Sequence, residues 1–279
     1  MTSIPSLTFH DGRQAPQLGF GVWQIADNRV EGVVSAALEM GYRSVDTAAI
    51  YDNESGVGRG IANAGIARDE LFVATKLWNT DHGHEPARQA FQDSLDRLGL
   101  DYVDLYLIHW PVPKVDQYVQ AWEALIALRD EGRAKSIGVC NFNIAHLQRL
   151  LDETGVLPVV NQIELHPRFQ QQELREFHAD NDIITEAWSP LGQGLLWDNP
   201  VLQKLANKHQ RTVAQVVLRW HIQLGNMVIP KSVTPARLKE NMAIFDFELD
   251  EDDMAAIATL DDADGRVGPD PELFRLPQG

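Results

Sequence analysis

Short apolar runs alternate with longer amphipathic stretches eight times along this chain, and this alternation constrains the fold most. The apolar runs lie at residues 18–22, 42–45, 71–75, 103–108, 135–139, 159–163, 183–187 and 227–229. Stretches with helical spacing follow at 29–40, 54–64, 86–98, 118–129, 144–151 and 171–178, in a region ending near 224, and at 235–242. Strands separated by such helices pair in parallel, because each crossover must return the chain to the same edge. Eight units predict an α/β fold, a closed (β/α)8 TIM barrel.

We expect residues 1–279 to form a single barrel domain, because no low-complexity linker interrupts the alternation. Single-domain barrels commonly have about 200–250 residues or more, and 44% hydrophobic residues allow a large core. An N-terminal β-hairpin is also predicted, since runs at 7–9 and 13–15 flank the turn-forming pair Asp11 and Gly12. The tail beyond Asp261 is rich in Asp, Gly and Pro and is expected to be irregular.

The charge and the cysteine content exclude several classes of protein. The net charge of −16 argues against nucleic-acid binding, which depends on clustered Lys and Arg. Cys140 is the only cysteine, so neither an intrachain disulfide nor a cysteine-based metal site can form. No run reaches about 18 apolar residues, and the N-terminal sequence lacks the basic start and apolar stretch of a signal peptide. We therefore expect a cytoplasmic enzyme that does not bind a membrane.

Polar side chains follow three neighbouring strands of the predicted barrel. Asp46 follows the second strand, with Tyr51 in the loop after it, and Lys76 and His109 follow the third and fourth strands. Active sites of such barrels lie at the carboxyl ends of the strands, so these four side chains should converge at one mouth. By position alone, each could equally belong to an ion pair at the rim or be a structural group.

Together, the four residue types suit proton donation to a carbonyl oxygen. A free tyrosine has a pKa near 10, too high for ready donation at neutral pH. A nearby ammonium such as Lys76 favours the phenolate and lowers that pKa, while a carboxylate such as Asp46 holds the lysine in place. A histidine can orient the carbonyl oxygen beside the tyrosine. Hydride must come from a cofactor, since no side chain delivers it.

Three long motifs resemble the aldo-keto reductase family. They are MGYRSVDTAAIYDNESGVGRGI, GVCNFNIAHLQRLLDETGVLPVVNQIELHP and IPKSVTPARLKEN, and the resemblance covers residues 18–261. Within the family the chain is most similar to prokaryotic 2,5-diketo-D-gluconate reductases, on the stretches LYLIHWPVP and EAWSPLGQG and the short C-terminal tail. The resemblance implies an NADPH-dependent, monomeric carbonyl reductase in which Tyr51 is the general acid. It further implies that Lys76 and Asp46 tune Tyr51 and that His109 orients the carbonyl group.

The cofactor site is expected after the last strands. No G-x-G-x-x-G is present, so the dinucleotide is not held by a Rossmann turn. Lys231 and Ser232 directly follow the eighth strand, with Arg237 one turn into the next helix, where barrels commonly bind phosphate. Alone, this grouping could equally be a capping serine with solvated cations. The resemblance implies a grip on the 2′-phosphate of NADPH, with Glu240 and Asn241 near the adenine.

The nicotinamide is expected deeper in the barrel. Asn141 and Gln162, at the ends of the fifth and sixth strands, can hydrogen-bond its carboxamide, and Trp188 after the seventh strand can stack on the ring. The family resemblance implies the same three roles. Small residues permit close backbone approach to a pyrophosphate, and the segment expected there contains Ser189, Leu191, Gly192 and Gln193.

Aromatic residues should line the mouth where a small-molecule carbonyl substrate binds. The expected wall, together with His109, contains Trp23, Trp78, Asn79 and Trp110. Two positions depart from the family pattern. Cys140 stands where serine is usual, and a thiol makes weaker hydrogen bonds to an amide. Asp52 adds a negative charge beside Tyr51.

The sequence offers three other interpretations. A glycosidase would need two facing carboxylates, for which Glu164 and Glu186 are the candidates, but Tyr51, Lys76 and His109 would then have no purpose. A non-catalytic, cofactor-binding regulatory subunit remains the alternative function. His82 and His84 lie two residues apart in a polar loop without a third strong ligand, so we expect no metal site.

Overall fold

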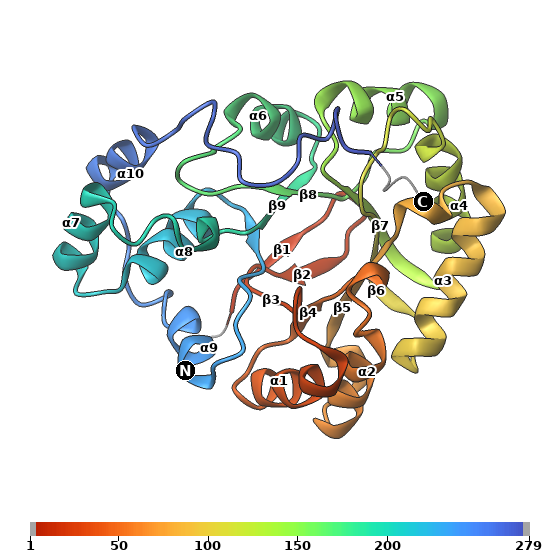
Figure 1. The fold of residues 1–279 in the computed structure, drawn as a ribbon, viewed down its shortest axis with the longest axis horizontal. Coiled ribbons are helices and arrows are strands. Elements are labelled where there is room, and N and C mark those ends of the chain that lie inside the picture. The colour runs from red at the N-terminus through yellow and green to blue at the C-terminus, as the bar shows by residue number, and fades with distance from the viewer. Residues whose placement is uncertain (1–3, 276–279) are drawn as a thin grey trace.

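The computed structural model describes residues 4–275 and has eight parallel strands ringed by helices (Figure 1). The strands are paired in chain order from β3 to β10, and their bounds are β3 Phe20–Gly21, β4 Ser44–Asp46, β5 Phe72–Leu77, β6 Val103–Ile108, β7 Ala134–Cys140, β8 Val160–Glu164, β9 Ile184–Trp188 and β10 Met227–Val228. The ring closes because the Gly19 amide donates to the Val228 carbonyl (2.9 Å), and the Val228 amide donates to the Gln17 carbonyl (2.9 Å). The predicted barrel is confirmed. The segments 1–3 and 276–279 of the expected domain lie outside the described residues.

Helices follow the strands and cover the outside of the barrel (Figure 1). Their bounds are α1 Asp27–Glu39, α2 Glu54–Asn63, α3 His84–Leu98, α4 Tyr118–Asp130, α5 Ile144–Thr154, α6 Gln172–Asp180, α7 Pro200–His209, α8 Val213–Gln223, α9 Pro235–Met242 and α10 Glu251–Ala258. Short 3₁₀ turns lie at η1 Ala49–Tyr51, η2 Arg68–Glu70, η3 Asn79–Asp81 and η4 Gly192–Gly194. No helix of the described residues is long and apolar enough to cross a membrane.

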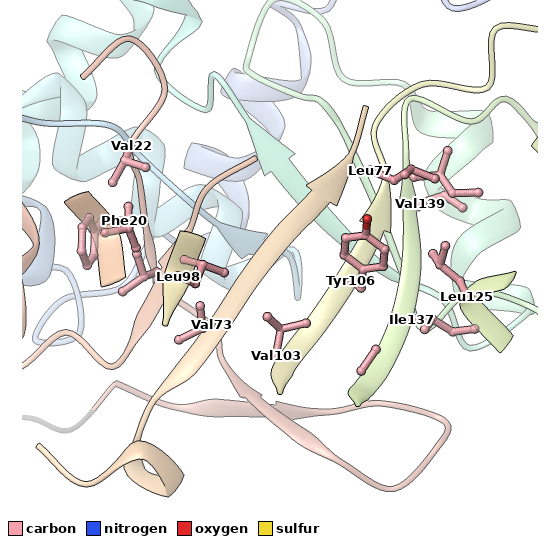
Figure 2. Packing of buried hydrophobic residues seen from close by; sticks show 14 of the residues in the cluster. Phe20, Val22, Val73, Leu77, Leu98, Val103, Tyr106, Leu125, Ile137 and Val139 are labelled. Carbon is pink, nitrogen blue, oxygen red and sulfur yellow. The ribbon is translucent and has the colours of Figure 1, made fainter. Parts of the chain in front are cut away.

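The strands carry apolar side chains on both faces, because helices cover one face and the barrel interior covers the other. On β5, Val73 and Leu77 pack outward against the helices, while Ala74 belongs to the interior cluster with Leu105 and Leu107. Figure 2 shows Val73, Leu77 and Tyr106 among the buried side chains of the outer cluster. The next inward position after Ala74 is Lys76, so the strand's alternation carries this lysine into the upper barrel.

The predicted N-terminal hairpin is present and plugs one end of the barrel. Strand β1 (Ser6–Thr8) pairs antiparallel with β2 (Gln14–Pro16), and its ribbon passes beneath the starts of the barrel strands (Figure 2). Phe9 from the turn packs into the interior cluster and meets Phe72 edge-on, with ring centroids 6.2 Å apart. This end is therefore filled by side chains, which leaves the carboxyl ends of the strands for a site.

Two features differ from the sequence-based expectation. The helical region ending near 224 is two helices, because Gln210 adopts a left-handed conformation (φ 53°) and Thr212 caps a new helix by accepting from the Gln215 amide. Helix α10 was not predicted, although Asp250 and Asp253 form a capping box at its start. The described tail beyond Asp261 has turns and no helix or strand, in line with the prediction.

Candidate active site

A cavity of about 520 Å³ opens at the carboxyl ends of the strands. All four residues predicted for catalysis meet here: Tyr51, Asp46 and His109 line the cavity, and Lys76 is buried beside Asp46 and Tyr51. The remaining wall is largely aromatic and amide in character and includes Trp23, Trp78, Trp110, Asn141, Gln162, Trp188 and Phe274.

Lys76 forms hydrogen bonds with both Asp46 and Tyr51. Its ammonium donates to Asp46 Oδ1 (2.6 Å), to the Thr47 carbonyl (2.8 Å) and to Tyr51 Oη (3.4 Å). The lysine side chain is completely buried. A buried ammonium needs a paired carboxylate, so Asp46 keeps the charge of Lys76 in place beneath the phenol.

The pKa of Tyr51 differs from the simplest expectation. Burial raises the pKa of Tyr51 to about 12, and the positive charge of Lys76 only partly opposes this rise. Lys76 does lower the pKa of Tyr51, as the sequence suggests, but burial raises that pKa by more. Tyr51 is therefore a neutral phenol at physiological pH. Burial would lower the pKa of Lys76, yet the charges of Asp46 and Tyr51 raise it, so the ammonium persists.

His109 is neutral in this site. Burial, and then the positive charge of Lys76, hold the pKa of His109 well below its usual value. Its Nδ1 atom is buried and has no hydrogen-bond partner among the described residues. An unpaired buried donor is costly, so Nδ1 is best left unprotonated and the proton placed on Nε2. The ring meets Tyr51 and Trp78 edge-on, at centroid distances of 5.7 and 5.3 Å, which fixes its orientation.

Two side-chain amides on the cavity wall are held by hydrogen bonds. Asn141, in a left-handed conformation (φ 63°), donates to the His109 carbonyl (3.0 Å) and accepts from Trp188 Nε1 (2.8 Å). Gln162 donates to Asp46 Oδ2 (3.0 Å) and to Glu186 Oε2 (2.9 Å). Such fixed amides, in a cavity that Trp188 also lines, suit a planar ring that carries a carboxamide.

A second cavity, of about 820 Å³, adjoins the first and contains the predicted phosphate residues. The two share Lys231, Ser189 and Trp23 among their wall residues. Residues lining the second cavity include Leu191, Gln193, Lys231, Ser232, Arg237, Glu240 and Asn241. The hydroxyl of Ser232 accepts from the Thr234 amide (3.2 Å) next to the start of α9. Two exposed cations at a helix start suit an anionic group.

Two expected residues lie away from the cavity walls. Asn79 is 2% exposed, and neither of its amide atoms has a partner within residues 4–275. Gly192 is buried, and a Cβ atom there would lie 3.1 Å from Leu196. Neither is among the described residues that line the two cavities. Of the two departures from the family pattern, Cys140 is fully buried at the end of β7, where burial raises its pKa, and Asp52 is exposed.

The carboxylates considered for a glycosidase are engaged elsewhere. Glu186 is tied to Gln162 below the cavity, and Glu164 accepts from the amides of Val267 (2.6 Å) and Gly268 (2.8 Å) in the tail. His82 is buried while His84 is exposed. Within the described part of the chain, no group of three or more potential ligands could hold a metal ion.

Sequence reasoning missed the contribution of the C-terminal tail. The blue segment after α10 passes α6 toward α5 (Figure 1). Phe274 stacks on Trp110 with ring centroids 4.4 Å apart and meets Trp78 edge-on. A Cβ atom at Gly268 would lie 2.4 Å from Trp188, so only glycine permits this close approach. A lone phenylalanine in a polar tail was the available signal.

Comparison with known proteins agrees with this geometry. The Aldo/keto reductase family matches residues 17–262. Methylglyoxal reductase DkgA of Yersinia pestis is 56% identical over 98% of this chain and 99% of its own length. An aldo-keto reductase of Mycolicibacterium smegmatis is 54% identical over 98% of each chain.

Solved structures give the same result. Apo Gox0644 superposes with a TM-score of 0.96 at 50% identity, covering 99% of this chain and 100% of that one. A mutant of Gox0644 in complex with NADPH superposes with a TM-score of 0.95 at the same identity and coverage. With both the motifs and the barrel matched over nearly its full length, the chain belongs to the aldo/keto reductase family.

Proposed function

We propose that this protein is an NADPH-dependent oxidoreductase that reduces aldehydes or ketones to alcohols, with Tyr51 as the general acid. The observation that carries the proposal is the buried Lys76 ammonium, which bonds both Asp46 (2.6 Å) and Tyr51 (3.4 Å) at the floor of an aromatic cavity. A neutral phenol over a fixed ammonium can give its proton to a developing alkoxide, because the resulting phenolate is stabilised at once.

The residues present fit the cofactor at both of its ends. Asn141 and Gln162 would hold the carboxamide and Trp188 the ring face, while Ser189 and Leu191, which line the second cavity, would follow the pyrophosphate. Lys231, Ser232 and Arg237 would hold the 2′-phosphate, with Glu240 and Asn241 near the adenine. NADPH, when bound, supplies the hydride that no side chain can provide. The NADPH and NADP complexes of the Gox0644 mutant and of a Bombyx mori aldo-keto reductase, 50% and 37% identical, support this assignment.

The side chains around the acid have separate tasks. Tyr51 donates a proton to the carbonyl oxygen as it gains charge, and Lys76 stabilises the phenolate that remains. Neutral His109 donates from Nε2 to the same oxygen and so fixes the carbonyl orientation. Trp23, Trp78 and Trp110 exclude water and bind the apolar part of a small substrate, with Asn79 supporting this wall from behind.

Dicarbonyls and keto-sugars are the substrate classes we propose, with methylglyoxal and 2,5-diketo-D-gluconate as the first candidates. The names of the DkgA relatives from Yersinia pestis and Escherichia coli, at 56% and 55% identity, support methylglyoxal. We further propose that the protein acts as a monomer in the cytoplasm.

A substrate panel tests the function directly. NADPH absorbance is followed with methylglyoxal, 2,5-diketo-D-gluconate, aryl aldehydes and β-keto esters, each with a parallel NADH reaction. The proposal expects turnover of at least one dicarbonyl or keto-sugar with a clear preference for NADPH. Absence of NADPH oxidation with every carbonyl would refute the reductase assignment, and equal use of NADH would refute the roles given to Lys231 and Arg237.

A further inference from the structure

One amide on the cavity wall has acids as both of its hydrogen-bond partners. Gln162 on β8 donates from Nε2 to Asp46 Oδ2 (3.0 Å) and to Glu186 Oε2 (2.9 Å). Gln162 lines the cavity, whereas Glu186 on β9 is 2% exposed and is not among the described lining residues. A hydrogen-bonding effect of Glu186 on a ligand must therefore pass through Gln162.

The two acids determine which way the amide points. A carboxylate oxygen can only accept, so the nitrogen of Gln162 must face Asp46 and Glu186, and both of its hydrogens are used. Within residues 4–275 no donor reaches Gln162 Oε1. The oxygen is therefore the polar atom that Gln162 has left for a ligand, and it accepts hydrogen bonds but donates none.

Among the described residues, no cation is a hydrogen-bond partner of Glu186. Lys76 from β5 donates its hydrogen bonds to Asp46, Thr47 and Tyr51 instead. The titratable groups that act on Glu186 are Asp46 from β4, Lys76 from β5 and the Cys140 thiol from β7. On the β10 side, the residue in register with Glu186 is Met227, which carries no charge.

We propose that Glu186 is a positioning residue of the cofactor site: with Asp46, it holds the Gln162 amide oxygen toward the cavity, so that the site accepts a ring carboxamide and rejects a ring carboxylate. A carboxamide donates an N–H to Gln162 Oε1, whereas a carboxylate has no hydrogen to donate and faces an acceptor. The inference rests on the proposed NADPH function, because it assigns the ligand of Gln162.

The hold of Glu186 on the Gln162 amide depends on pH in a definite direction. Burial, followed by the charge of Asp46, raises the pKa of Glu186 to about 7. Above that pH the ionised Glu186 can only accept, so it enforces the amide orientation and also repels a ring carboxylate. Below it, protonated Glu186 no longer requires a donor opposite it, so Asp46 alone then holds the amide orientation. Discrimination between the two rings should therefore rise as the pH increases from 6 to 8.

The test compares two ligands that differ at this one group. Dissociation constants are measured by quenching of protein fluorescence for NADP⁺ and for nicotinic acid adenine dinucleotide phosphate, which has a carboxylate in place of the carboxamide. In the wild-type protein NADP⁺ should bind more tightly, and its advantage should grow at pH 8. In Glu186→Leu, which removes the acceptor, the advantage should fall by about tenfold or more, as expected for loss of one hydrogen bond to a charged group.

A second variant separates positioning from packing. Glu186→Gln keeps the shape and an acceptor oxygen but cannot titrate. The ratio of its two dissociation constants, for the carboxylate analogue and for NADP⁺, should therefore stay near the wild-type value at pH 6 and remain constant up to pH 8. The dissociation constant of 2′,5′-ADP, which lacks the ring, should be unchanged in both variants. An unchanged ratio in Glu186→Leu, or a persistent pH dependence in Glu186→Gln, would overturn the role of Glu186. Failure of the wild-type protein to bind NADP⁺ would instead refute the proposed function.

Discussion

Glu164 ties the tail to the barrel, and replacing it tests whether the tail forms the substrate wall. The Glu164 carboxylate accepts from the amides of Val267 (2.6 Å) and Gly268 (2.8 Å) and from His166 Nε2 (2.9 Å). In Glu164→Gln one carboxylate oxygen becomes an NH₂ group, so at least one of the two tail amides faces a donor instead of an acceptor. A hydrogen bond to a charged group contributes about 1.5–3 kcal/mol, which corresponds to a roughly 10- to 150-fold larger open population of the tail.

The assay for this prediction is amide hydrogen exchange combined with steady-state kinetics. Amide exchange at Val267 and Gly268 should accelerate by roughly 10- to 150-fold. The KM for the carbonyl substrate should rise because Phe274 leaves Trp110. The dissociation constant of 2′,5′-ADP should not change, since the phosphate cavity lies elsewhere. Glu173→Gln, an exposed glutamate on α6, serves as the matched control. Unchanged exchange at both amides would refute the anchoring role of Glu164.

The attachment of the tail to Glu164 also has a predicted pH dependence. Burial by itself would raise the pKa of the Glu164 carboxyl, but the hydrogen bonds that it accepts lower that pKa below its usual value. The ionised carboxylate therefore stabilises the docked tail above the ordinary glutamate pKa of about 4.3, and this contribution is lost as the pH falls through the lower folded-state pKa. Tail exchange corrected for the intrinsic rate should thus stay constant from pH 5 to 8.

Three further outcomes are expected. Arg237→Ala should weaken NADPH binding by about tenfold or more and leave NADH binding unchanged, while Lys239→Ala on the same helix changes neither, by fluorescence titration. Cys140 is fully buried with a raised pKa, so its thiol should be unreactive toward alkylating reagents until the protein unfolds; rapid labelling of the native protein would contradict this. His109 is neutral throughout, so kcat/KM should show no inflection near pH 6.5, and an inflection that disappears in His109→Gln would show that the histidine is protonated.

The sequence predicts the barrel and its mouth because both depend on local patterns. The alternation of apolar runs and helices locates every barrel strand, and residues 103–108 match β6 at both ends. Parallel strands end at one rim, so the sequence alone groups Asp46, Lys76 and His109. The helix at Glu251–Ala258 was not predicted, although the capping-box residues Asp250 and Asp253 are a local signal for its start.

What the sequence does not predict are contacts and burial between distant segments. Glu164 and Val267 are 103 residues apart, and no local pattern links them. The pKa of Tyr51 likewise depends on how deeply the folded chain buries the phenol, so residue type alone suggests a fall where the structure gives a rise. Gln162 was identified as a cofactor residue, but the two acids that hold it come from β4 and β9.

The central claim is proton donation by Tyr51, and the most direct measurement is NADPH oxidation by Tyr51→Phe beside the wild-type protein with a saturating dicarbonyl. Removing the phenolic hydroxyl should lower kcat by about 10²- to 10⁴-fold, because general acid catalysis contributes that much, while NADPH binding by fluorescence titration stays within about twofold. A Tyr51→Phe variant that keeps a tenth or more of the wild-type kcat would contradict the account.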